Sequence, residues 1–146
     1  MHLLVSVANA TEAVSALDGG ADLIDAKNPT AGALGAVTLD VLRAICGAVG
    51  DARPVTAALG DAADQRTVAR DAHAFATAGA ALVKVGFAGV TDPDRAATLG
   101  AAAVRAASLG GAGVVLVAYA DAARVGSLDP RALVAVATAA GARGVL

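Results

Sequence analysis

Two lysines are the residues whose type and position point most directly to chemistry. Every other basic side chain is an arginine, and the only lysines are Lys27 and Lys84. Both stand near the ends of apolar runs, "LIDAK" and "LVKVG", where a charged group is poorly placed unless it faces a cavity. Unlike arginine, lysine can lose its proton and act as a nucleophile or a base. We therefore expect both amines in one pocket; the alternative is that they reach out to solvent.

Asp25 precedes Lys27 by two residues, so the alternation of a strand predicts that both side chains share one face. A carboxylate there would hold Lys27 charged while the site is empty, yet it suits proton transfer during carbinolamine dehydration and enolisation. Two ammonium groups aimed into one pocket disfavour each other's charged form, which activates a Schiff-base lysine. A structural Asp25–Lys27 ion pair is the alternative.

The elements that must position these residues follow from the hydrophobic pattern. Short apolar runs rich in β-branched residues alternate with alanine-rich segments of helical length, which predicts successive strand–helix units. Glycine stands where each helix must stop before the next buried strand. Residues suited to helix N-caps precede the expected helices: Thr11, Thr38, Asp64, Asp92 and Asp129.

Continuous apolar strands are typical of a parallel sheet buried on both faces. No "GxGxxG" or "GxxxxGK[ST]" motif accompanies them, which argues against a nucleotide-binding sheet. Polar residues at the ends of several strands favour a TIM-type (β/α)8 barrel, whose active site is assembled at one face. We count six strands and five helices, so we expect one (β/α)-barrel domain over residues 1–146 that lacks its last units.

Composition narrows the possible partners. Hydrophobic residues make up 57% of the chain, and its 11 basic residues are scattered among 13 acidic ones, so neither nucleic acid nor a membrane surface is expected. The longest apolar run is about half the ~20 residues of a spanning helix, and the first residues lack signal-peptide features, which predicts a cytoplasmic protein. The single cysteine, Cys46, fits a buried apolar position, and the two histidines show no metal-ligand spacing. A small-molecule substrate, no metal and a homo-oligomer are the expectations.

The longer motifs are specific. "DLIDAKNPTAGALGA", "PVTAALGD", "LVKVG" and "VAYADAARVGSLDP" resemble, in order and spacing, the (5-formylfuran-3-yl)methyl phosphate synthase family of methanofuran biosynthesis. The resemblance covers essentially the whole chain. It implies a TIM-barrel lyase that joins two molecules of glyceraldehyde 3-phosphate into a furan aldehyde phosphate, with loss of one phosphate and water. No metal or organic cofactor is implied.

The resemblance also implies roles for residues. Lys27 is then the Schiff-base lysine, Asp25 its acid/base neighbour and Lys84 a second catalytic lysine. Family members continue beyond the sixth strand into a segment with a further aspartate and lysine and then two more units, whereas nothing here follows Leu146. Another Schiff-base aldolase-type barrel, or a non-catalytic shortened subunit, stays open as an alternative.

Weaker candidates for substrate binding lie beside these motifs. Asn28 follows Lys27 directly, and Tyr119, Asp121 and Arg124 lie just beyond the fifth strand. Arg124 is placed to meet a phosphate, although a helix-start aspartate with a solvated arginine explains the same pattern. Gly32 and Gly35 make "NPTAGALG" flexible, so this segment is either a lid or a turn.

Overall fold

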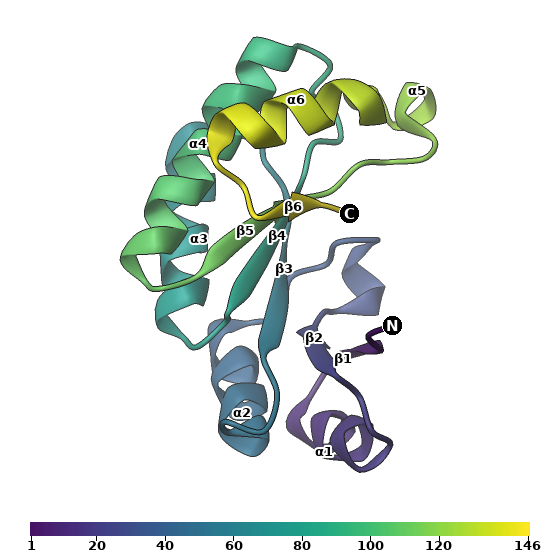
Figure 1. Cartoon of the computed structure of the whole chain (residues 1–146), viewed down its shortest axis with the longest axis vertical. Helices are drawn as coiled ribbons and strands as arrows, with labels where there is room; N and C mark the ends of the chain where they lie inside the picture. The colour runs from purple at the N-terminus through teal and green to yellow at the C-terminus, as the bar shows by residue number, and fades with distance from the viewer.

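The computed structural model describes residues 1–146 and alternates strands with helices along the chain (Figure 1). The strands are β1 Leu4–Val7, β2 Leu23–Ala26, β3 Val55–Asp61, β4 Leu82–Gly86, β5 Gly113–Leu116 and β6 Gly144–Val145. The long helices are α1 Ala10–Asp18, α2 Leu39–Val49, α3 Gln65–Thr77, α4 Pro93–Leu109 and α6 Pro130–Ala140. The six strands and five long helices agree with the sequence-based count. A 3₁₀ turn, η1 Pro29–Ala31, and a one-turn helix, α5 Ala122–Val125, were not anticipated.

All six strands are parallel, and their order in the sheet is the order in the chain, β1 to β6. A doubly wound sheet reverses its strand order at a switch point, and this sheet does not. The winding is therefore that of a barrel. The barrel is not closed, because β1 pairs only with β2 and β6 only with β5.

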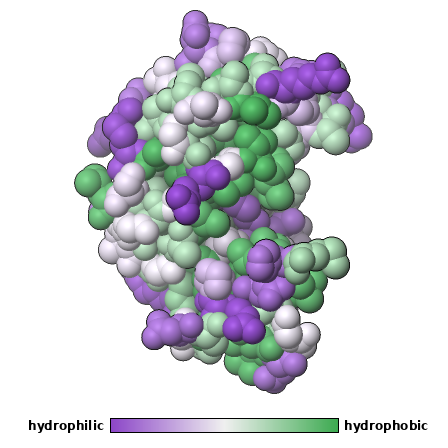
Figure 2. All heavy atoms as spheres, in the orientation of Figure 1, coloured by the Kyte–Doolittle hydropathy of each residue, from purple (hydrophilic) through white to green (hydrophobic).

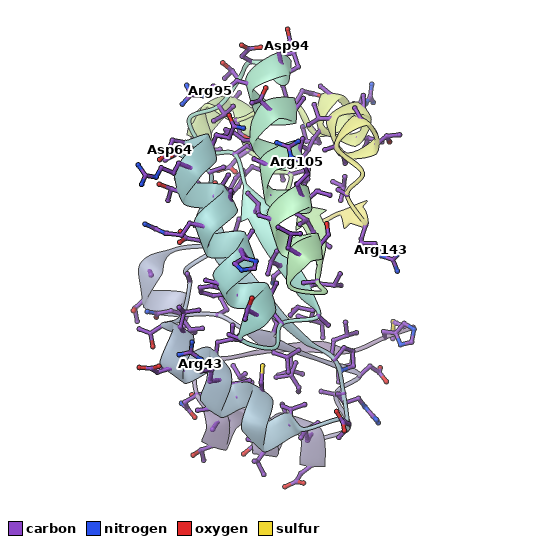
Figure 3. All side chains as sticks on the ribbon, turned by 90° about the vertical axis from the view of Figure 1, so that its left-hand side faces the viewer. Arg43, Asp64, Asp94, Arg95, Arg105 and Arg143 are labelled. Carbon is purple, nitrogen blue, oxygen red and sulfur yellow. The ribbon has the colours of Figure 1, made fainter.

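The long helices cover one side of the sheet, and both chain ends lie on the other side (Figure 1). Charged side chains of these helices, such as Arg43, Asp64 and Arg105, point away from the sheet (Figure 3). In the space-filling view the side that holds the termini is hollowed (Figure 2). We call the helix-covered side of the sheet the outer face and the opposite side the inner face.

The hydrophobic core fills the space between the outer face and the helices. Ile24, Val83 and Val85 are completely buried there. They belong to a contiguous cluster of 33 buried apolar residues. Alternation along the same strands sends the residues between them to the inner face, which is where the candidate site lies.

Four of the five expected N-caps are confirmed: Thr38, Asp64, Asp92 and Asp129 each accept a backbone N–H of the following turn. The expectation for Thr11 is wrong, because α1 begins earlier and is capped by Asn9. The Asn9 Oδ1 accepts the Glu12 N–H at 2.9 Å, while the Glu12 carboxylate accepts the Asn9 amide at 2.9 Å. This reciprocal pair resembles a capping box, so the helix begins two residues earlier than it would with Thr11 as its N-cap.

Three further features bear on the sequence-based expectations. Cys46 is only half-buried, and burial raises the pKa of its thiol. Both histidines are exposed, and no three His, Cys, Asp or Glu residues are grouped as metal ligands would be. None of the helices combines the length and the apolar character needed to cross a bilayer.

Candidate active site

Strand register brings a row of polar side chains together on the inner face. Ser6 of β1 is paired with Asp25 of β2, and Asp25 is paired with Thr56 of β3. In a parallel sheet, residues that are paired in register point to the same face. One carboxylate therefore lies between two hydroxyl groups.

Asp25 is the centre of this cluster and is only 1% exposed. Its Oδ2 accepts the Ser6 hydroxyl at 3.0 Å, and its Oδ1 accepts the Thr56 hydroxyl at 2.7 Å. The Lys84 Nζ donates to Oδ2 at 2.5 Å. Three donors, one of them cationic, fit an ionised carboxylate, and no buried polar side-chain atom in the structure lacks a hydrogen-bond partner.

Lys84 reaches this carboxylate from two strands away. It is paired in register with Ala58 of β3, and its side chain passes over that strand to β2. Ala58 is completely buried and contributes only a methyl group, which leaves room for the lysine stem. Lys84 itself is 6% exposed, so the two charges share an environment with little water. The strand-end position expected for Lys84 is wrong, because β4 continues to Gly86 and Lys84 is its middle residue. Its side chain faces the protein rather than bulk solvent.

Lys27 differs from Lys84 in having no charged partner. Its backbone N–H donates to the Val7 carbonyl at 3.0 Å, which extends the parallel pairing one residue past β2 and keeps its side chain on the face of Asp25. The side chain is half-buried, and no side-chain hydrogen bond or ion pair joins it to the protein. The alternative of an Asp25–Lys27 ion pair is therefore wrong, because Lys84 occupies that carboxylate.

The segment after Lys27 folds back over the inner face. The Asn28 Oδ1 accepts the Thr30 N–H at 3.1 Å and the Thr30 hydroxyl at 2.8 Å, so this oxygen caps η1. The Asn28 N–H closes the segment by donating to the Gly35 carbonyl at 2.8 Å. Leu34 is thereby buried against Ala58, Val117 and the ring of Tyr119. The segment from Asn28 to Gly35 thus covers part of the inner face, and Leu34 makes its apolar contact with that face.

A second polar pair lies at the carboxyl ends of β3 and β5. The Tyr119 hydroxyl donates to the Asp61 Oδ1 at 2.8 Å, and the Ala88 N–H donates to the same oxygen at 2.8 Å. An irregularity in β3 between Ala58 and Asp61, with Gly60 at a φ of +84°, changes the register and turns Asp61 toward this end. Burial, together with the hydrogen bond to Asp61, raises the pKa of Tyr119 well above its ordinary value.

Asp121 and Arg124 lie apart from the buried cluster. They stand at the start and within the single turn of α5, and their charged groups are 3.8 Å apart. The Arg124 side chain is 85% exposed. The structure therefore places this pair at the solvent-facing rim beyond β5.

Sequence reasoning named Asp25, Lys27, Lys84 and Tyr119, and it missed Ser6, Thr56 and a site role for Asp61. Ser6 and Thr56 interrupt otherwise apolar runs, and each stands at a position paired with Asp25. A polar residue inside a buried strand was the available signal.

Comparisons with known proteins show which family the chain is similar to. The family model described as 4-HFC-P synthase matches residues 3–146. The chain is 42% identical over 142 residues to (5-formylfuran-3-yl)methyl phosphate synthase of Methanopyrus kandleri, covering 95% of this chain and 60% of that protein. It is 38% identical over 144 residues to the synthase of Methanothermobacter thermautotrophicus, covering 97% and 61%. The chain thus spans about three fifths of the length of these relatives.

Solved structures show the same fold at lower identity. A phosphonopyruvate hydrolase superposes with a TM-score of 0.78 at 20% identity, covering 99% of this chain and 57% of that one. A 2,3-dimethylmalate lyase of the PEP mutase/isocitrate lyase superfamily superposes with a TM-score of 0.73 at 23% identity, covering 99% and 56%. These likenesses show the barrel-type winding, whereas the family model and the relatives define the family. The chain belongs to the 4-HFC-P synthase family.

Proposed function

We propose that this chain carries the Schiff-base site of a (5-formylfuran-3-yl)methyl phosphate synthase, a lyase of methanofuran biosynthesis. In the proposed reaction, two molecules of glyceraldehyde 3-phosphate condense to the furan aldehyde phosphate and release one phosphate and two waters. The names of the relatives support the product. Because the chain spans about three fifths of their length, the whole reaction is proposed for a full-length protein, meaning a polypeptide that covers the whole length of these relatives.

One observation carries the proposal: the carboxylate beside Lys27 is occupied by another lysine. An aspartate that paired with Lys27 would stabilise its ammonium form and oppose nucleophilic attack. Asp25 is instead bound to Lys84, and Lys27 is half-buried without an ion pair. These features suit an amine that attacks a carbonyl carbon.

In the steps we propose, Lys27 is the nucleophile and the Lys84–Asp25 pair transfers protons. The Lys27 Nζ forms a bond to the aldehyde carbon, and the aldehyde oxygen becomes the hydroxyl group of a carbinolamine. A proton delivered from the Lys84–Asp25 pair lets that hydroxyl leave as water, which produces the iminium. The iminium withdraws electrons from the neighbouring carbon, whose proton then passes to a base of the same cluster. Asn28 adds an amide nitrogen next to Lys27 that has no partner in the structure and is available as a donor to substrate.

Borohydride trapping tests the proposal directly. In the full-length protein, incubation with glyceraldehyde 3-phosphate and sodium borohydride is expected to add the reduced substrate to the peptide that contains Lys27, as measured by mass spectrometry. Lys27→Arg keeps the charge and abolishes the adduct. An adduct on a different residue contradicts the assignment.

A second incubation separates the synthase from an aldolase that acts on another carbonyl compound. Glyceraldehyde 3-phosphate as the only substrate is expected to produce a furan chromophore, which an aldolase of different specificity does not form. Trapping without a chromophore would support the aldolase, and the absence of both would support a non-catalytic subunit.

A further inference from the structure

The Asp61–Tyr119 pair is the part of the inner face for which the steps above assign no role. It lies next to Gly86, the last residue of β4, which stands two positions after Lys84 and therefore on the same face, about 6.5 Å further along the strand. A Cβ on Gly86 would lie 2.8 Å from the Tyr119 hydroxyl oxygen and 2.5 Å from a methyl carbon of Leu34, and it would collide with the Asp61 carboxylate. The pair is thus packed directly against the backbone of the strand that carries Lys84.

The hydrogen bonds determine what this pair offers to a ligand. A tyrosine hydroxyl has one hydrogen, and Tyr119 gives it to Asp61. What faces outward on the phenol oxygen is therefore a lone pair. Asp61 accepts at Oδ1 from Tyr119 and Ala88, while its Oδ2 has no partner in the structure. Both groups can accept hydrogen bonds from a ligand, and neither has a hydrogen to give.

The charges around this pair also favour a ligand that donates a hydrogen bond. No lysine or arginine forms an ion pair with Asp61, and Arg124, the cation on α5, is paired with Asp121. Asp121 adds a second negative charge that acts on Tyr119. The raised pKa of Tyr119 keeps its proton on the hydroxyl group, so it continues to donate to Asp61 at neutral pH. An anionic phosphate is repelled by such an environment, whereas a hydroxyl group can donate to it.

We propose that Asp61 and Tyr119 form an acceptor subsite that selects the hydroxyl group next to the carbonyl of a small sugar phosphate and excludes its phosphate. Tyr119 contacts the substrate, and Asp61 is the positioning residue that fixes the direction of the tyrosine hydroxyl. The inference rests on the proposed function, because the triose phosphate supplies that hydroxyl. It also keeps the phosphate away from Tyr119.

The test compares two aldehydes that differ only in this hydroxyl group: glyceraldehyde 3-phosphate and 3-oxopropyl phosphate. The readout is the concentration of each that gives half-maximal borohydride trapping in the full-length protein. We expect the wild type to prefer glyceraldehyde 3-phosphate by about tenfold, the worth of one good hydrogen bond. Tyr119→Phe keeps the ring against Leu34 and should remove this preference while leaving 3-oxopropyl phosphate unchanged. Asp61→Asn should also reduce the preference for glyceraldehyde 3-phosphate over 3-oxopropyl phosphate.

A variant far from the inner face provides the comparison. Arg105→Gln, a loss of charge on the outer surface of α4, is expected to leave the ratio between the two aldehydes as it is. A Tyr119→Phe variant that binds both aldehydes more weakly by one common factor, or that keeps the wild-type preference, overturns the proposal. If the wild type traps neither aldehyde, the proposed function fails and the subsite fails with it, an outcome that no variant is needed to recognise.

Discussion

The two faces of β2 and β4 are about equally buried, but they are chemically opposite. On the outer face, Ile24 and Val83 are completely buried against the helices. On the inner face, Asp25 and Lys84 are 1% and 6% exposed and bind each other. Neighbouring residues of the same strand are thus buried on opposite faces of the sheet. Apolar contacts stabilise the outer face, whereas an ion pair and hydrogen bonds connect the side chains of the inner face.

This difference separates what the fold needs from what the site needs. Burying an apolar side chain stabilises the fold by about 1.5–3 kcal/mol and requires no particular partner. A buried ion pair is often no more stabilising than apolar residues of the same size, yet loss of one partner is strongly destabilising. Stability alone therefore does not explain why Asp25 and Lys84 occupy the inner face, whereas the proposed carbonyl chemistry would.

Replacement of Lys84 by methionine should have the largest effect. Methionine retains an apolar stem but leaves the Asp25 carboxylate buried with only the Ser6 and Thr56 hydroxyl groups. We expect the free energy of unfolding to fall by about 3–5 kcal/mol, measured by urea denaturation, and turnover to be lost. The double variant Asp25→Asn/Lys84→Met removes both charges and should recover much of the stability without recovering turnover. A double variant as unstable as the single one would contradict the charge argument.

Thr56→Val should have the next largest effect. Valine has nearly the same shape, so the substitution removes mainly the 2.7 Å hydrogen bond from the buried hydroxyl to Asp25. A hydrogen bond to a charged group contributes about 1.5–3 kcal/mol, and the free energy of unfolding should fall by that amount. Turnover should also fall, because the carboxylate is then less firmly oriented. Denaturation and steady-state kinetics on the same preparation check both effects, and unchanged values for both would show that Thr56 only fills space.

Much of the fold could be predicted because it depends on local pattern. Apolar runs of strand length, glycine at helix ends and side chains such as Thr38 and Asp129 at N-caps all act within a few residues of one another. Their spacing is visible in the sequence, so strand number, helix number and parallel winding followed. The unpaired edges at β1 and β6 also agree with the expectation of a barrel that lacks its last units.

The candidate site was predictable in its residues but not in its contacts. Two scarce lysines and a nearby aspartate stand out in the sequence, but the partner of Asp25 depends on register. Pairing of Asp25 with Thr56 and of Ala58 with Lys84 decides that the distant lysine reaches the carboxylate. Asp61 is the last residue of β3, but the irregularity at Gly60 that turns it toward Tyr119 has no simple sequence signal.

Ile24→Val tests the outer face and should have a smaller effect. The substitution removes one methylene group from a completely buried position in the apolar core. We expect the free energy of unfolding to fall by about 0.5–1.5 kcal/mol, with turnover unchanged. Because Ile24 is the sequence neighbour of Asp25, this variant is also the matched control for the inner-face substitutions. A large loss of turnover here would mean that the two faces are not independent.

Asp64 on the outer helices should give the smallest effect, and one that depends on pH. The backbone N–H of Thr67 donates to its carboxylate at 2.9 Å, and this bond, followed by the Thr67 side chain, lowers the pKa of Asp64 from its ordinary value of 3.8. A carboxyl group whose pKa is lower in the folded state stabilises the fold above its unfolded pKa, and that contribution is lost as the pH falls through the folded value. Asp64→Asn retains a cap that does not titrate. The wild type should therefore have a higher urea midpoint than this variant at neutral pH, and the difference should disappear in acid below the lowered pKa.

Thr67→Val provides a control. It removes one of the groups that lower the pKa of Asp64, so it should narrow the difference in urea midpoint between an aspartate and an asparagine at position 64 at neutral pH. A difference that persists in acid would show that the aspartate acts through its shape and not through its charge.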